Sequence, residues 1–101
     1  MSRRVVVTGV GLVCACGIGT EETWQNLVAG KSGIRKITQF DASAFDCQIA
    51  GEIRDFDPFR WIEKKELKKM ARFIQVAIAA TDFAVKMARL EVTEDIANST
   101  G

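Results

Sequence analysis

The hydrophobic positions at the start of the chain predict one buried strand. β-Branched residues begin at Val5 and continue through Val10 to Val13, and they place apolar side chains on both alternating faces. Apolar residues on both faces are typical of a strand that is covered on both sides, as in a layered α/β sheet. Gly17 and Gly19 then interrupt the apolar run. We therefore expect a buried strand first and a turn after it.

The next block changes to helical spacing. Thr20 is a favourable N-cap, two glutamates follow it in the first turn, and Gly30 is typical of a residue that ends a helix. Residues 31–45 are mostly small and polar and predict a loop, whereas residues 47–53 alternate loosely and predict a second, short strand. The apolar face of this helix consists of Trp24, Leu27 and Val28.

The last block predicts the longest helix. Asp57 and Pro58 first start a short helical turn, since proline is tolerated at the first helical position. From Met70 to Leu90, apolar residues keep one helical face and then extend it most of the way round. A helix so apolar needs cover on several sides. The whole pattern predicts an α/β fold with two strands and several helices, one of them long and apolar.

Composition narrows the function classes. The chain has 101 residues, which suits one small domain or a piece of a larger one. Its net charge of +1 gives no general reason to expect a nucleic acid or membrane partner. No apolar stretch reaches the roughly 18 residues of a transmembrane helix. The three cysteines suit reduced thiols in a cytoplasm, and the absence of histidine removes the commonest general base and metal ligand.

The opening sequence RRVVVTGVGLVCACG admits other interpretations than a buried strand. Two arginines before an apolar run, with Cys16 in a loose lipoprotein box, would suit an exported precursor, although consecutive valines favour a strand. Gly9 and Gly11 match only the first two glycines of a dinucleotide-binding motif. Cys14 and Cys16 lie two residues apart, which fits thiols packed in a core better than a metal site. We therefore expect no metal and no cofactor.

A local cluster of positive charge stands out against the balanced composition. Residues 60–72 carry six basic residues against two glutamates, a local balance of six minus two, or +4. Helical spacing places four of the six near one side and the other two beside it. From charge alone, the cluster is either a solvated helix face or a docking surface for an acidic partner. The six residues are Arg60, Lys64, Lys65, Lys68, Lys69 and Arg72.

The sequence RRVVVTGVGLVCACGIGTEETWQNLVAGKSGI resembles the N-terminus of β-ketoacyl-acyl carrier protein synthases, particularly the type II elongating condensing enzymes of the thiolase superfamily. The likeness continues through FDASAF, AGEIRDFDP, KKELKKMARFIQVAIAATDFAVKMARL and the closing STG, so it covers essentially the whole chain. The opening block and the KKMARFIQVAIAA helix are the specific signals. Cys14 and Ala15 depart from the usual Ser or Thr and Pro or small residue, a change that concerns packing at the end of the strand.

This resemblance implies that residues 1–101 are the N-terminal segment of a synthase domain with a thiolase-like layered fold, and that the rest of the fold is absent. The family lengthens acyl chains by decarboxylative Claisen condensation, with a nucleophilic Cys and two His. Their positions lie beyond residue 101, so we expect no catalytic residue here and no activity of this segment alone. The resemblance also implies a cytoplasmic enzyme, homodimeric when complete. The glycines of the opening sequence are expected to serve the turn after the first strand, and not to bind a phosphate.

The resemblance also changes the interpretation of the basic cluster. In the family, basic residues matching Lys65, Lys68 and Lys69 dock the acidic acyl carrier protein that brings the acyl or malonyl group. Complementary charge of this kind mainly raises the encounter rate and fixes orientation. Two other function classes stay open from the residues alone: a non-catalytic binding module that uses the same basic face, and an exported lipoprotein precursor.

Overall fold

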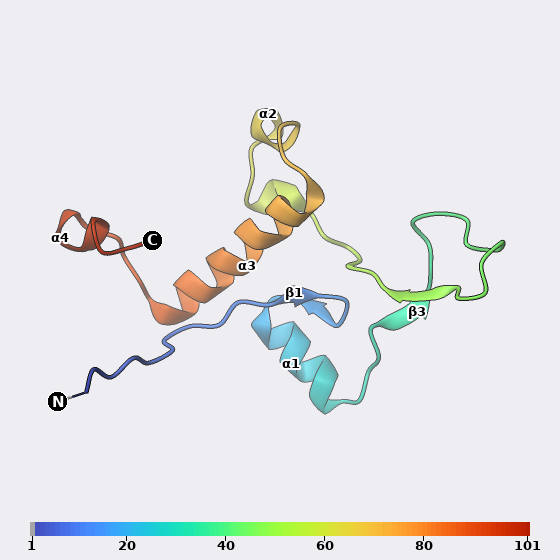
Figure 1. The fold of residues 1–101 in the computed structure, drawn as a ribbon, viewed down its shortest axis with the longest axis horizontal. Coiled ribbons are helices and arrows are strands. Elements are labelled where there is room, and N and C mark those ends of the chain that lie inside the picture. The colour runs from blue at the N-terminus through green and yellow to red at the C-terminus, as the bar shows by residue number, and fades with distance from the viewer. Residues whose placement is uncertain (1) are drawn as a thin grey trace.

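A computed structural model describes residues 2–101 and shows a mixed α/β architecture with two small antiparallel sheets (Figure 1). The described chain measures 56 × 37 × 23 Å, and its radius of gyration of 17.4 Å exceeds the roughly 13 Å of a compact domain of this length. The α/β prediction is confirmed, and the arrangement is open. In chain order the elements are β1 (Val13–Cys14), β2 (Gly17–Ile18), α1 (Thr20–Val28), β3 (Ile34–Lys36), β4 (Ile49–Gly51), the 3-10 helix η1 (Pro58–Arg60), α2 (Lys64–Leu67), α3 (Arg72–Ala88) and α4 (Glu94–Ala97).

The first apolar block is not the buried strand that its sequence predicts. Residues 2–12 belong to neither a helix nor a strand, and Val5 and Val7 are 92% and 82% exposed. Only β1 is paired, antiparallel to β2, with Val13 opposite Ile18. The prediction is wrong for the described residues because a strand needs a neighbour for its backbone hydrogen bonds, and none of the described segments takes that place.

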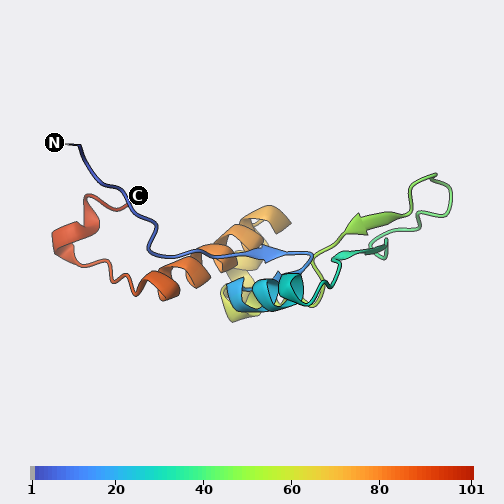
Figure 2. The same ribbon diagram turned by 90° about the horizontal axis from the view of Figure 1, so that it is seen from below.

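The part of this stretch just before β1 instead packs along α3, and Figure 2 shows it running beside the helix. A Cβ at Gly11 would overlap the carbonyl oxygen of Ala80 in α3, and one at Gly9 would overlap that of Ala84. Two extended residues span about 6.6 Å and four helical residues rise about 6 Å, so alternate glycines meet successive helical turns. Gly9 and Gly11 therefore serve close packing on α3, and not the predicted turn.

Helix α1 has nearly its predicted bounds but a different N-cap. Gly19 is the N-cap, with a φ of 105° that side chains rarely adopt. The Thr20 hydroxyl donates to the Val10 carbonyl at 2.7 Å, so it ties the helix to the N-terminal segment. Gly30 has a φ of 72° and its N–H donates to the Leu27 carbonyl at 3.1 Å, which confirms that the helix ends there.

The second sheet pairs the predicted short strand with a segment that its sequence assigns to a loop. β4 pairs antiparallel with β3, and Ile34 lies opposite Gly51. All three residues of β3 are exposed, and two of them are basic, so no apolar alternation marks the strand. Glu52, 8% exposed, accepts hydrogen bonds from the Thr38 N–H at 2.7 Å and hydroxyl at 2.8 Å. These two bonds, the backbone one first, hold the pKa of Glu52 below its usual value.

Helix α3 lies within residues 70–90, the range predicted for the longest helix. Ala71 is extended, with φ −72° and ψ 158°, so the helix begins after it. It ends at Arg89, whose φ of 54° is left-handed; the N–H groups of Arg89 and Leu90 donate to the carbonyls of Lys86 and Val85, each at 3.2 Å. Only Ala79 is buried on this helix, and Phe73 is 72% exposed. The described residues therefore leave much of its apolar surface open.

Apolar side chains are mostly exposed in the described part of the chain. The apolar face predicted for α1 is open, with Trp24 at 64% and Val28 at 69% exposure. No helix within residues 2–101 combines the length and apolar composition needed to cross a membrane. The buried apolar residues of the described chain are Ala42, Phe56, Ile62 and Ala79.

Candidate functional site

The three lysines of the predicted docking surface lie close together on a short turn, and not on one continuous helix. Lys65 belongs to α2, Lys68 is the C-cap of that helix, and Lys69 follows it. The helical spacing expected across residues 60–72 is broken, because η1 comes first and α3 starts only after an extended residue. Figure 1 shows α2 at the top of the view, standing away from the body of α3. We call residues 63–69 the lysine segment.

The lysine side chains are exposed and only weakly paired. The Nζ atoms of Lys65 and Lys69 lie 3.8 Å from carboxylate oxygens of Glu63 and Glu66, and the two lysine side chains are 77% and 73% exposed. Exposed pairs of this kind contribute about 0 to 1 kcal/mol. Lys68 forms no ion pair with any other described residue. The lysine segment therefore presents a positive field to solvent that its own glutamates only partly offset.

An aromatic cluster fixes the chain just before the lysine segment. The Trp61 ring stacks on Phe56 with centroids 5.5 Å apart and planes 11° apart, and it meets Phe83 of α3 edge-on at 5.7 Å. The indole Nε1–H donates to Asp82 Oδ2 at 3.0 Å. Ile62, only 6% exposed, follows at once. The start of the lysine segment is thus anchored to α3.

Asp82 carries the negative charge of this cluster. Its Oδ2 also lies 2.9 Å from Lys86 Nζ, one helical turn further along α3. The hydrogen bond from Lys86 is the largest cause that holds the pKa of Asp82 below its usual value; desolvation opposes it, and the Trp61 bond adds to it. The carboxylate is therefore ionised near neutral pH. Sequence reasoning missed this pair because Trp61 and Asp82 are 21 residues apart and no motif links them.

Two arginines that the charge pattern grouped with the lysines have other neighbours in the structure. The Arg60 guanidinium lies 4.6 Å from the centre of the Trp61 ring. The Arg72 guanidinium lies 5.1 Å from the centre of the Phe56 ring, and its Nη2 donates to the Ile53 carbonyl at 3.3 Å. Both arginines therefore support the aromatic cluster through cation–π contacts. Of the six basic residues predicted to form one face, only the lysines therefore stay available to a partner.

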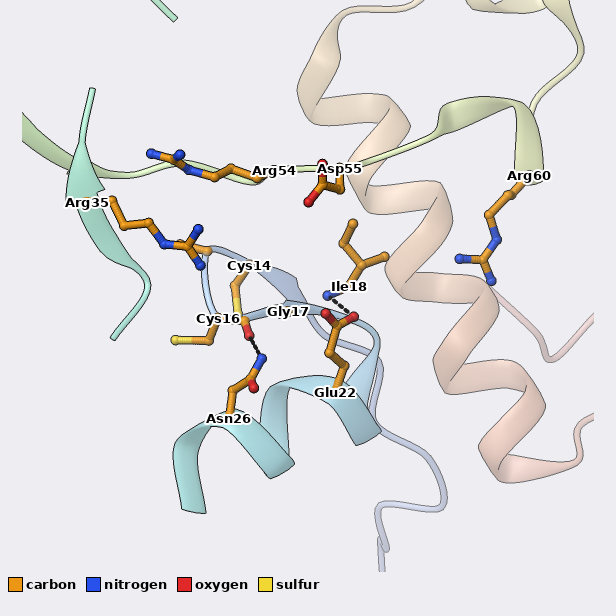
Figure 3. Close-up of a pocket in the computed structure, with 11 residues that line it drawn as sticks. Cys14, Cys16, Gly17, Ile18, Glu22, Asn26, Arg35, Arg54, Asp55 and Arg60 are labelled. Atoms are coloured by element: carbon orange, nitrogen blue, oxygen red, sulfur yellow. Dashed lines mark hydrogen bonds between the residues drawn. The ribbon is translucent and has the colours of Figure 1, made fainter. Parts of the chain in front are cut away.

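A cavity of about 250 Å³ lies between the β1–β2 hairpin and the chain that leads to η1 (Figure 3). Its lining brings guanidinium groups from three separate segments together with two carboxylates. Because the lining is charged and polar, the cavity suits water or a polar group and not an acyl chain. The sequence did not predict this cavity, since nothing in it shows that these segments meet. The charged lining residues are Glu22, Arg35, Arg54, Asp55 and Arg60.

The cysteines do not form the core pair that their spacing predicts. Cys14 and Cys16 both line the cavity and are half-buried, but Cys16 lies in the turn between β1 and β2, so a shared strand face is lost. The Cys14 thiol lies 3.8 Å from the Thr23 hydroxyl. Cys47 is exposed in the loop between β3 and β4 and is not part of the lining. Within residues 2–101, no three potential metal ligands come together.

The chain is similar to known proteins in sequence and in fold. The family model described as the N-terminal domain of β-ketoacyl synthase matches residues 2–101. The 3-oxoacyl-[acyl-carrier-protein] synthase 2 of Coxiella burnetii is 44% identical over 99 residues, and that of Synechocystis is 40% identical over 99 residues. Each alignment covers 98% of this chain and 24% of the relative. The chain thus spans about a quarter of the length of these curated relatives.

A solved structure shares the fold as well as the sequence. The ishigamide ketosynthase/chain length factor matches with a TM-score of 0.79 and 47% sequence identity, over 92% of this chain and 23% of that chain. The family match includes the opening apolar stretch, so that stretch is part of the matched domain. The sequence resemblance and the geometry therefore lead to the same family.

Proposed function

Because the chain belongs to the β-ketoacyl synthase family, we propose that it forms the N-terminal segment of a 3-oxoacyl-[acyl-carrier-protein] synthase. Such an enzyme lengthens acyl chains in fatty acid biosynthesis by decarboxylative Claisen condensation of acyl and malonyl thioesters. The proposal is supported by the function that gives the curated relatives their name and by the match across residues 2–101.

The condensation needs groups that this segment does not provide. A thiolate must accept the acyl group, and hydrogen-bond donors must stabilise the enolate that forms as carbon dioxide leaves. The segment contains no histidine, and its three cysteines lack the motif of the family nucleophile. We therefore assign it no catalytic residue and expect it to be inactive by itself. The reacting Cys and two His belong to the remainder of the synthase.

The contribution of this segment to function is a docking surface for the acyl carrier protein, made of Lys65, Lys68 and Lys69. The exposure of these side chains on a turn that stands away from α3 is the observation that carries the proposal. Their charge acts over a Debye length of about 8 Å at physiological salt, so an acidic partner is attracted before contact. Docking then delivers the carrier-bound substrate to the enzyme.

In the complete synthase, we propose a cytoplasmic homodimer in which other parts of the layered fold cover the surfaces that are open here. The exposed apolar side chains of the N-terminal segment, α1 and α3 support this view, because contiguous apolar surface is costly in water. Helix α3 then becomes the long apolar helix of the core. No cofactor is required, since the decarboxylation itself supplies the nucleophilic carbon.

Charge reversal of two lysines tests the docking role in the synthase that contains this segment. Lys68→Glu combined with Lys69→Glu should raise the KM for carrier-protein substrates by about tenfold or more, which corresponds to roughly 1.4 kcal/mol of lost interaction. Activity on small acyl thioesters should stay nearly unchanged, because the lysines lie outside the reacting groups. The increase in KM should shrink as salt shortens the Debye length below about 8 Å.

Lys31→Glu combined with Lys36→Glu is a matched control with the same change in net charge. Figure 1 shows β3, which ends at Lys36, far from α2. This control should leave the KM nearly unchanged, and an equal increase in both variants would show a general charge effect. If the docking variant loses activity on both substrate classes equally, the lysines support the fold. Carrier-protein binding without condensing activity in the unmodified protein would instead indicate a non-catalytic binding module.

A further inference from the structure

The lysine segment is too short to maintain its own orientation. α2 has four residues, whereas isolated helices of fewer than about 12 residues are marginal in water. Its internal stabilisation comes from main-chain bonds, such as Leu67 N–H to the Glu63 carbonyl at 3.0 Å, and from two exposed ion pairs. The direction in which the lysines point must therefore be set by contacts at the two ends of the segment.

The first end is held by Trp61, two residues before the segment begins. Stacking on Phe56 and the edge contact with Phe83 fill the space around the indole, but ring contacts of this kind tolerate sliding and in-plane rotation. The hydrogen bond to Asp82 tolerates less rotation, because an N–H···O bond prefers an angle above about 150° and weakens steeply below about 120°. This bond selects one orientation of the indole and, with it, one direction for the chain that follows.

The chain that follows the lysine segment returns to the Phe56 ring, on which Trp61 also stacks. Arg72, the first residue of α3, lies with its guanidinium 5.1 Å from the centre of the Phe56 ring. Phe56 is 9% exposed and is one of the few buried apolar residues described. Residues 61–72, which include the lysine segment, therefore form a loop whose two ends both contact the Phe56 ring. A loop closed at both ends has fewer orientations than one fixed at a single end.

We propose that Trp61 and Asp82 are positioning residues for carrier-protein docking, because their hydrogen bond holds the lysine segment so that its three ammonium groups face the partner together. The inference rests on the docking role proposed above. Its benefit is preorganisation: side chains and loops that are already ordered lose less freedom when the partner binds. The effect is therefore expected in the binding of the carrier protein and not in the chemical step.

Trp61→Phe tests the hydrogen bond, since it removes the N–H and keeps an aromatic ring beside Phe56. In the synthase that contains this segment, the KM for carrier-protein substrates should rise about two- to tenfold, the range expected for one hydrogen bond. The kcat and the activity on small acyl thioesters should not change. Asp82→Ala should reproduce this increase, whereas Asp82→Asn keeps an acceptor and should stay near the unmodified enzyme. Trp24→Phe changes an indole of α1 that belongs neither to the lysine segment nor to its aromatic cluster, so it is the matched control and should leave the KM for carrier-protein substrates unchanged.

A double-mutant cycle separates the positioning role from docking itself. In the Lys68→Glu, Lys69→Glu background, Trp61→Phe should add little, because little of the lysine surface is left to orient. An equal increase in both backgrounds would overturn the positioning role and leave docking intact. A normal KM after charge reversal alone would overturn docking, and positioning with it. Lower thermal stability with equal losses on both substrate classes would show that Trp61 only supports the fold, and would also overturn the inference.

Discussion

Replacing Gly11 by alanine tests the close approach between the N-terminal segment and α3. The added Cβ would overlap the carbonyl oxygen of Ala80 and lie 2.8 Å from both the Ala80 carbonyl carbon and the Ala84 amide nitrogen. Contacts of a real Cβ shorter than 3.0 Å are essentially never seen. All these neighbours are backbone atoms inside a helix, which cannot move singly. The N-terminal segment would have to withdraw from α3.

The expected cost follows from two opposing effects. Overpacking at a close contact costs about 1 to 3 kcal/mol. Alanine also restricts the unfolded chain, which stabilises the folded state by about 0.4 to 1 kcal/mol where the native conformation tolerates a Cβ. The steric cost is the larger, so Gly11→Ala should lower the free energy of unfolding by about 1 to 2 kcal/mol. The sign of the change therefore depends on the contact with α3.

Denaturant unfolding of the synthase that contains this segment measures the change as a shift of the midpoint at constant slope. Gly30→Ala is the comparison variant: no described atom lies within 4 Å of its added Cβ, but its φ of 72° disfavours a side chain, so it reports backbone strain without a steric overlap. If Gly11→Ala proves as stable as the unmodified protein, the packing of this segment on α3 is refuted.

Two further predictions concern association and pH. The isolated 101-residue chain should aggregate or depend on partner chains, because apolar side chains such as Val5 and Phe73 are 92% and 72% exposed. A monodisperse monomer with a sharp, cooperative thermal transition would contradict this prediction. The ionised Glu52 should stabilise the fold fully above the ordinary value of 4.5, and this stabilisation should be lost as the pH falls through its lowered pKa. Unfolding midpoints of Glu52→Gln and the unmodified synthase should therefore differ at pH 7 and converge in acid, whereas a constant difference would exclude this carboxylate as the cause.

The elements that could be predicted from sequence are those stabilised within a few residues. The end of α1 at Gly30 and the helical turn at Pro58 were both expected, and both depend on backbone preferences that act inside one turn. The family was recognisable for a related reason, because the order and spacing of its motifs are a property of the linear chain. The positive charge of Lys65, Lys68 and Lys69 is equally local. These features need no knowledge of distant contacts.

Pairing between distant segments could not be predicted in this way. The valines after Val5 satisfy every local criterion of a strand, yet a strand exists only where a second segment takes its hydrogen bonds. β3 shows the converse, since a weak pattern becomes a strand because β4 lies beside it. Gly9 and Gly11 suggested a turn, but their role was decided by the backbone of α3 more than 60 residues later.

The candidate site also has features that the sequence shows and features that depend on distant contacts. The sequence alone determined which residues are charged and that they occur close together. Only the tertiary structure decided how they are held, by joining Trp61 to Asp82 across 21 residues and bringing Arg72 back to Phe56. The physical reason is that charge belongs to a residue, whereas a hydrogen bond or a ring contact belongs to a pair, and the partner is chosen by how the whole chain packs.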